Sequence, residues 1–256
     1  MSHVLVVHPG QMGSALGRAL VAAGHRVSWD PVGRSGASAE RARAAGLVEW
    51  DAAQRPDVVL SVVPPVHARS TAERFADVAE YFVDANAISP ATAVTVAAAI
   101  DAAGGHHVDG SIIGPPPDPS RSRSTRLYLS GPHADRVASL LDCGPELEIG
   151  VLDAPYAASS LKMAYASWTK ISSALLLSAR EAAERLGVGD ELVAEWAHSQ
   201  PDLAARHDAA VAAASGKAWR WAEEMRQIAA TFESCGLPEG FGDAAATVFD
   251  GYPVAD

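Results

Sequence analysis

The sequence predicts an α/β fold: a doubly wound parallel sheet in residues 1–153, followed by an all-helical domain in residues 154–256. Up to about residue 150, short apolar strands alternate with amphipathic helices, which is typical of a parallel sheet covered on both faces. From Ala154 onward every periodic segment is helical, beginning with a long pattern from Ala158 to Leu186. A chain of 256 residues is long enough to form both cores.

The composition indicates a globular protein and argues against several kinds of partner. Hydrophobic residues make up 48% of the chain and charged residues 20%, a balance typical of folded domains. The net charge of −11 argues against a DNA- or RNA-binding surface, which needs clustered Lys and Arg. No apolar run approaches the roughly 20 residues that span a bilayer, and no basic leader precedes an apolar segment at the N-terminus. We therefore expect a cytoplasmic protein without a membrane segment.

Neither the two cysteines nor the pair His106-His107 has the spacing of metal ligands, so we expect no metal site.

The first strand, Val4–Val7, leads through a glycine turn into a helical pattern from Ala15 to Ala23. A buried strand followed by such a turn and a helix N-terminus is typical of sites that bind the pyrophosphate of a dinucleotide. Gly10 and Gly13 occupy the second and third glycine positions of this fingerprint, whereas His8 stands at the first. A tight turn without a ligand remains the alternative. The residues expected at the cofactor phosphates are His8, Pro9, Gly10, Gln11, Met12 and Gly13.

Polar and proline residues follow several of the predicted strands, and the carboxyl ends of parallel strands form the ligand crevice in such folds. The predicted strands are Val4–Val7, Arg26–Trp29, Val58–Val63, Tyr81–Asp84, His107–Val108 and Leu127–Ser130. At their ends we expect Val63, Pro64 and Asn86 to contact the cofactor, and Ser111 to lie near the substrate. Each of these segments taken alone is also typical of an ordinary turn.

Two later segments have a distinct character. Residues 114–124 combine proline, serine and arginine without apolar periodicity, which predicts a loop that is either a lid or solvated surface. In the helical domain, patterns from Asp190 to His198 and from Lys217 to Ser234 follow the long helix. The second of these places Trp221, Met225, Ile228 and Phe232 on one face, as core or as a dimer interface.

Four segments together resemble the β-hydroxyacid dehydrogenase and 6-phosphogluconate dehydrogenase superfamily, which includes the imine reductases. They are His8–Gly13, Val83–Pro90, Ile112–Pro117 and Leu161–Trp168. More narrowly, they are similar to an actinobacterial-type branch with its own helical C-terminal domain, in which the His-Pro-Gly opening is usual. The resemblance covers nearly the whole chain and implies a Rossmann-type domain joined by a long interdomain helix to a substrate and dimerisation domain.

The resemblance also implies a catalytic lysine on the interdomain helix, and Lys162 matches it. A lysine in a closed cleft can serve as general acid or base. The Asn and Glu that usually follow this lysine are replaced by Ala166 and Thr169, which argues against 6-phosphogluconate as the substrate. Substrate orientation then falls to other groups, for which the candidates are Tyr165, Ser167, Asn86 and Ser111. The pair Ile112-Ile113 replaces a polar family element and predicts a less polar pocket.

The residues after the second strand bear on the choice between NAD and NADP. An acidic side chain there accepts hydrogen bonds from the ribose of NAD, whereas Arg or Ser meets the 2′-phosphate of NADP. Asp30 stands one residue ahead of the usual acidic position, while Arg34 and Ser35 follow in the loop, with Arg41 as a further candidate. We therefore expect NADP, with NAD as the alternative.

These observations predict an NAD(P)-dependent oxidoreductase that moves hydride between the nicotinamide and a small hydroxy-acid-like molecule, with Lys162 transferring the proton. The resemblance further implies a homodimer. Two alternatives stay open: an imine reductase on the same scaffold, and a nucleotide-binding protein without catalysis.

Overall fold

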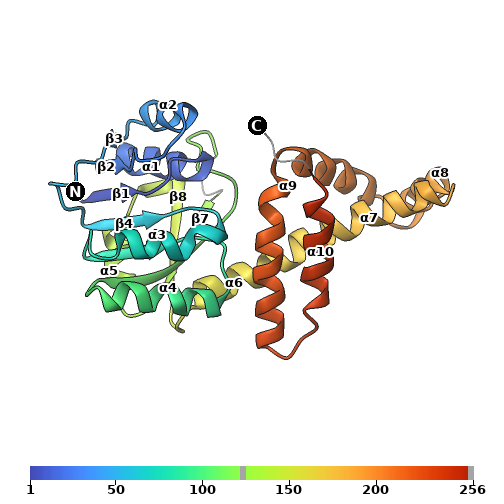
Figure 1. The fold of residues 1–256 in the computed structure, drawn as a ribbon. Coiled ribbons are helices and arrows are strands. Elements are labelled where there is room, and N and C mark those ends of the chain that lie inside the picture. The colour runs from blue at the N-terminus through green and yellow to red at the C-terminus, as the bar shows by residue number, and fades with distance from the viewer. Residues whose placement is uncertain (122–124, 253–256) are drawn as a thin grey trace. The chain divides into compact units, whose positions relative to one another are not determined.

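In a computed structural model, which describes residues 1–121 and 125–252, the chain forms two compact units, Met1–Lys162 and Met163–Asp256. The first contains an eight-stranded sheet with helices on both faces and the second is all-helical, so the predicted fold class is confirmed (Figure 1). The division between the units falls within helix α6 (Ala157–Ala166), whose first half is bonded to the sheet. Within the described residues, no helix is both long and apolar enough to cross a membrane.

The sheet has the strand order β3-β2-β1-β4-β5-β6-β7-β8. Neighbouring strands are parallel except β6 and β7, which are antiparallel. The strands are β1 (His3–Val6), β2 (Arg26–Trp29), β3 (Val48–Glu49), β4 (Val58–Ser61), β5 (Tyr81–Asp84), β6 (His106–Ile113), β7 (Thr125–Ser130) and β8 (Leu147–Leu152). The chain reverses its direction of winding between β1 and β4, the position where doubly wound sheets bind ligands.

The predicted strand His107–Val108 was too short. The observed strand runs on to Ile113 because its second half pairs with the antiparallel β7, a partner that the expected all-parallel sheet did not provide. Strands β3 and β8 were not predicted at all. Both residues of β3 are exposed, and only the first residue of β8 is buried, so neither has the apolar pattern of a central strand.

Helices cover the two faces of the sheet in separate groups (Figure 1). Side chains of α1 (Gln11–Ala22), α2 (Gly36–Ala44) and α5 (Ala134–Leu140) form one apolar core with the sheet. Those of α3 (Ala68–Phe75) and α4 (Pro90–Ala102) form the other. Two short 3₁₀ turns, Pro65–His67 and Gly144–Glu146, complete this unit. Because β1 lies between both layers, Val4, Leu5 and Val6 are fully buried.

In the second unit, the long helix predicted from Ala158 to Leu186 is interrupted. A π-helical segment, Ser167–Ile171, separates α6 from α7 (Ser172–Arg185). The helices α8 (Gly189–Ser199), α9 (Leu203–Ser234) and α10 (Gly240–Asp250) follow, of which α10 was not predicted.

The stripe on α9 belongs to the core of the second unit. Met225 and Ile228 are fully buried, and the Trp221 ring contacts the Phe249 ring of α10 edge-on, with 5.1 Å between ring centroids. Of the two interpretations of this stripe, core and dimer interface, the structure therefore supports the first.

Candidate cofactor site and lysine centre

The turn after β1 has the close backbone approach that the glycine pattern predicts. A Cβ atom at position 13 would lie 2.2 Å from the carbonyl oxygen of His8, so only glycine fits at Gly13. Gly10 is the N-cap of α1, in extended conformation. Among the described residues, no side chain caps this helix end and no acidic residue lies in its first turn. The helix N-terminus, which includes Gln11 and Met12, therefore presents backbone N–H groups and the positive end of its dipole at the turn.

A cavity of about 440 Å³ lies beside this turn. It brings together four residues predicted at the cofactor, His8, Arg34, Val63 and Pro64, which come from three loops. The cavity also contains residues that sequence reasoning missed: His67, Ser70, Thr71 and Arg74. They lie on α3 and the turn before it, and no local motif signals that this segment faces the end of β1.

Asp30, directly after β2, is buried, and its carboxylate is held by arginines from two segments. Arg74 approaches it at 2.8 Å, and Arg34 at 3.8 Å. Arg34 also donates to the carbonyl oxygen of Val7, at 3.2 Å. Burial lowers the pKa of Arg34, the Asp30 charge opposes this, and the Arg74 charge lowers the pKa further. Two guanidinium groups therefore share one carboxylate at the edge of the cavity.

Two further residues after β2, Ser35 and Arg41, form hydrogen bonds with backbone groups. The Ser35 hydroxyl accepts a hydrogen bond from the Ser38 backbone N–H, at 3.3 Å, and so caps α2. Arg41 donates from Nε to the carbonyl oxygen of Pro9, at 3.1 Å, which ties α2 to the turn after β1. Pro9 is itself buried.

Asn86 links the ends of β4 and β5. Its Oδ1 accepts from the Val63 N–H at 2.6 Å, and its Nδ2 donates to the Ser61 hydroxyl at 3.1 Å. Its own backbone N–H donates to Asp84 Oδ1, at 3.0 Å. Because its side chain is buried and bonded on both atoms, Asn86 shapes the loop that carries Val63 and Pro64. Burial raises the pKa of Asp84 to about 7, and the neighbouring Asp109 adds to the shift.

Lys162 extends from α6 to the end of β6, where its ammonium group donates to the Ile112 carbonyl oxygen at 2.9 Å. The Ile112 and Ile113 side chains are buried, and Gly114 leaves the strand with a φ of 119°. Ser111 does not lie after the strand, as the sequence suggested, but inside it. Its hydroxyl is fully buried and has no hydrogen-bond partner among the described residues.

Tyr165 belongs to the second unit, and its side chain is half exposed. Nearby, the Ser167 hydroxyl donates to the Ala164 carbonyl oxygen, at 2.8 Å. A substrate-orienting role for Tyr165 stays a prediction.

The proline-rich loop is fixed at its start. Arg18 on α1 donates to the Pro117 carbonyl oxygen at 3.1 Å and pairs with Glu146 at 2.6 Å. Residues 122–124, the end of the predicted loop, lie outside the described residues.

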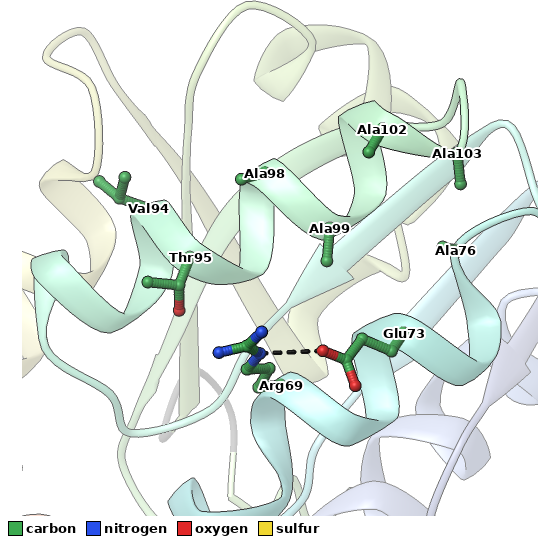
Figure 2. A pocket seen from close by; sticks show the side chains of 9 residues that line it. All are labelled: Arg69, Glu73, Ala76, Val94, Thr95, Ala98, Ala99, Ala102 and Ala103. Atoms are coloured by element: carbon green, nitrogen blue, oxygen red, sulfur yellow. Dashed lines mark hydrogen bonds and ion pairs between the residues drawn. The ribbon is translucent and has the colours of Figure 1, made fainter.

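A second, larger hollow has none of the features of a reactive site. A groove of about 700 Å³ between α3 and α4 is lined mainly by alanines, and its only charged groups, Arg69 and Glu73, pair with each other at 2.9 Å (Figure 2). No cluster of three or more His, Cys, Asp or Glu that could hold a metal ion occurs in residues 1–121 and 125–252.

Comparison with known proteins gives matches over the whole chain and over parts of it. Residues 183–251 match a family described as a domain of unknown function, DUF1932. An uncharacterised 28.5 kDa protein of Methanothermus fervidus is 31% identical over 144 residues, which span 56% of this chain and only 54% of that protein. The chain thus matches about half the length of this relative.

Solved structures match over nearly the full length. The conserved protein MTH1747, of unknown function and described as similar to 3-hydroxyacid dehydrogenases, has 28% identity and a TM-score of 0.70, over 97% of this chain and 95% of that one. A Mycobacterium tuberculosis 3-hydroxyisobutyrate dehydrogenase, solved with L-serine, has 18% identity and a TM-score of 0.72, over 97% and 92%. A Myxococcus stipitatus imine reductase, solved with NADP+, has 19% identity and a TM-score of 0.59, over 96% and 92%. The predicted resemblance is confirmed at the level of the fold, because the structural neighbours include 3-hydroxyisobutyrate dehydrogenases and imine reductases.

Proposed function

We propose that this chain, which has the fold of the 3-hydroxyacid dehydrogenases and imine reductases, is a nicotinamide-dinucleotide-dependent oxidoreductase. One observation carries the proposal: the turn with the close approach at Gly13, which leads into the uncapped N-terminus of α1, contributes His8 to a cavity that Arg34 and Arg74 also line. Backbone N–H groups and a helix dipole suit the pyrophosphate, and the adjacent cavity suits the adenosine half. His8, Val63 and Pro64 would then form the wall of the site.

We further propose that NADP is preferred over NAD. Asp30 is buried and already engaged by Arg34 and Arg74, so its carboxylate is not presented to the ribose hydroxyl groups of NAD. The same cluster carries two positive charges against one negative charge, and the Arg34 and Arg74 side chains are 22% and 44% exposed. A 2′-phosphate is the part of NADP that such an excess of positive charge would bind.

Calorimetric titration with NADPH and NADH tests both statements. We expect NADPH to bind at least about tenfold more tightly, because a hydrogen bond to a charged group contributes about 1.5–3 kcal/mol. Arg34→Ala and Arg74→Ala should each weaken NADPH binding by about tenfold and leave NADH binding unchanged. Arg43→Ala, which replaces an exposed arginine of α2, serves as the control. Equal affinities would contradict the NADP preference, and absence of binding of both at millimolar concentration would contradict the function itself.

For the reaction, we propose that Lys162 transfers the proton. When bound, the nicotinamide ring accepts or supplies the hydride at C4. In oxidation, Lys162 would take the hydroxyl proton as the hydride leaves the same carbon; in reduction, it would give a proton to the carbonyl oxygen or imine nitrogen. The Ile112 carbonyl oxygen, which accepts a hydrogen bond from the Lys162 ammonium, holds that group at the end of β6.

Two substrate classes fit this centre, small hydroxy acids and cyclic imines. The 3-hydroxyisobutyrate dehydrogenase and the imine reductase with this fold represent one class each. Ile112 and Ile113 stand where the family has polar groups, and Ala166 stands where it has Asn, and both changes favour the less polar imine. Turnover of 3-hydroxy acids with NADP+, compared with reduction of cyclic imines with NADPH, separates the classes.

Lys162→Met tests the role of the lysine, because Met keeps the length of the side chain and removes the proton. We expect turnover to fall by at least about 100-fold, which is the lower range for a general acid or base, while NADPH affinity stays within about twofold. A variant that keeps its turnover would contradict the role. A wild-type protein that binds NADPH and turns over neither substrate class would instead favour a nucleotide-binding protein without catalysis.

We also propose a homodimer formed through the second unit. Trp168, in the π-helical segment, and Leu175, on α7, are 70% and 69% exposed. Exposed side chains of this size are typical of interfaces. A dimeric mass by light scattering for the wild type, and a monomeric mass for Trp168→Ser/Leu175→Ser, would support this surface; two dimeric masses would contradict it.

A further inference from the structure

The helix that carries Lys162 begins on two side chains of the sheet. Asp109 of β6 accepts hydrogen bonds from the Ser159 backbone N–H, at 3.0 Å, and from the Ser159 hydroxyl, at 2.5 Å. Ser130 of β7 accepts from the Ala158 N–H at 3.1 Å and donates to Asp109 at 2.7 Å. Two of the N–H groups that a helix N-terminus leaves unpaired are thus bonded to neighbouring strands. All the side chains in this cluster are buried.

The same strand holds α6 at a second point. Asp109 bonds to Ser159, and three residues further along β6 the Ile112 carbonyl oxygen accepts from Lys162. Ser159 and Lys162 are also three residues apart, so they lie on one face of α6. Three residues span about 10 Å along a strand and about 4.5 Å along a helix, and the long lysine side chain covers the difference. The position of the ammonium group therefore depends on where the first turn of α6 is fixed.

The backbone that enters α6 is strained. Tyr156, which precedes α6 in sequence, has a φ of 54°, and it is the only non-glycine residue with positive φ among the described residues. A bulky residue in this region costs on the order of 1 kcal/mol and persists only where surrounding bonds hold it. The bonds from Asp109 and Ser130 begin two residues later, and they supply that hold.

The carboxyl group of Asp109 has the environment of an ion. It accepts three hydrogen bonds, one from Ser130 and two from Ser159, and it lies at the N-terminal, positive end of the α6 dipole. Asp84, its partner across β5 and β6, has a second carboxyl oxygen without a hydrogen-bond partner among the described residues. Burial raises the pKa of both groups. Hydrogen bonds from Ser159 and Ser130 oppose this rise in pKa at Asp109, and the Asn86 N–H opposes it at Asp84.

We infer that Asp109 is a positioning residue for Lys162: with Ser130 and Ser159 it fixes the first turn of α6 on β6 and so keeps the lysine ammonium at the end of that strand. This positioning role rests on the proposed function, in which Lys162 transfers the proton. The hydrogen bonds of Asp109 and Ser130 to the first turn of α6, here called the clamp, do not depend on any cofactor or substrate.

The chain contains only three lysines, Lys162, Lys170 and Lys217, so lysine labelled with ¹³C at Cε gives three NMR signals, and Lys162→Arg assigns the first. In Asp109→Asn, the amide cannot accept all three hydrogen bonds. We expect the Lys162 signal to move at least half-way toward its position in unfolded protein, with the other two signals unchanged. Ser159→Ala should move it in the same direction by less, and Ser159→Thr, which keeps the hydroxyl, should restore it.

Asp84→Asn is the matched control, because it makes the same change in an equally buried residue on the next strand, whose hydrogen bond in the described part of the chain goes to Asn86 and not to α6. The Lys162 signal should stay in place there. An unchanged Lys162 signal in a folded Asp109→Asn variant, or movement of all three signals together, overturns the inference. If Asp109→Asn does not fold, the Ser159→Ala and Ser159→Thr pair decides in the same way.

A second measurement separates this inference from the proposed function. Once a substrate is found, Asp109→Asn should lower kcat by about tenfold with unchanged NADPH affinity, whereas a general loss of structure would lower both. If the wild type turns over no substrate, the proposed function fails. The NMR result still decides whether Asp109 fixes the position of Lys162.

Discussion

Two buried acids at the ends of parallel strands show how differently this sheet treats the same group. Asp30 directly follows β2 and Asp84 ends β5, and each residue is 1% exposed. Asp30 has Arg74 at 2.8 Å and Arg34 at 3.8 Å. Asp84 has no cation paired with it among the described residues; its neighbours are the Asn86 N–H and a second carboxyl group, Asp109. Burial alone therefore does not decide how an acid is stabilised in this sheet, because the positive charge must come from a distant segment.

The different surroundings of Asp30 and Asp84 correspond to the different roles of the two strand ends. The end of β2 borders the cavity proposed for the adenosine half of the cofactor, where an ionised acid can hold two arginines in place. The end of β5 shapes a turn: Asp84 needs only one oxygen to accept the Asn86 N–H, and the carbonyl oxygen of a neutral acid can also accept it.

The largest effect is expected from Asp30→Asn. Removal of the carboxylate leaves Arg34 and Arg74 close together without their shared counterion, so the protein should lose about 2 kcal/mol of unfolding free energy at pH 7. This figure is below that for a fully buried pair because the Arg74 side chain is 44% exposed. Urea denaturation measures the change. A loss under about 0.5 kcal/mol, the usual scatter of surface substitutions, would mean that Asp30 does not need its arginines.

The sequence predicted one side of this comparison better than the other. The strand, glycine turn and helix at residues 4–23 are local, and their pattern alone indicated the turn that the structure contains. Arg74 comes 44 residues after Asp30, on a helix whose contact with the end of β2 depends on strand order. No spacing rule could pair them.

At Lys162, too, the sequence did not predict the contacts between residues that lie far apart in the chain. The resemblance indicated Lys162, but the strand that holds it was predicted to end at Val108, so Asp109 and Ser111 were expected in a loop. The antiparallel pairing with β7 extends β6 and buries both side chains. Asp109 then reaches α6 across a separation of 50 residues, which only the folded chain reveals.

The same substitution at Asp84 should have the opposite sign. The pKa of Asp84 is about 7 in the folded protein, against an ordinary value of 3.8, so as pH rises from 4 to 7 the unfolded chain loses the proton first and stability falls. The slope for one such group approaches about 1.4 kcal/mol per pH unit. Asp84→Asn removes this loss and keeps the oxygen that accepts the Asn86 N–H. We expect a gain of about 2 kcal/mol at pH 8, about half of what the full slope over three pH units would give, since relaxation around a buried carboxylate reduces its penalty, and almost none at pH 4.

Urea denaturation at pH 4, 6 and 8 measures this dependence for both proteins. Asp77→Asn, which replaces an exposed acid just after α3, is the control and should change stability equally little at each pH. A destabilised Asp84→Asn at pH 8 would mean that the ionised carboxylate has a partner and that the contrast with Asp30 is wrong.

A smaller effect is expected from His107, two residues before Asp109 on β6. Burial lowers the pKa of His107 to about 4, and its Nε2 has no hydrogen-bond partner among the described residues. As pH falls from 6.5 toward 4, the unfolded chain binds a proton that the folded protein does not, so this residue lowers stability toward acid pH. His107→Leu should therefore raise stability by about 1 kcal/mol at pH 5 and change it little at pH 8, after allowance for the change in packing.

The two titrations oppose each other between pH 4 and pH 6.5, since Asp84 lowers stability as pH rises and His107 raises it. The wild-type protein should therefore show a nearly flat profile in this range, which by itself would suggest that no buried group titrates. Each single substitution removes one slope and exposes the other: stability should rise with pH in Asp84→Asn and fall with pH in His107→Leu. Parallel profiles for the two variants would show that the buried pair on β5 and β6 is not the source of either slope.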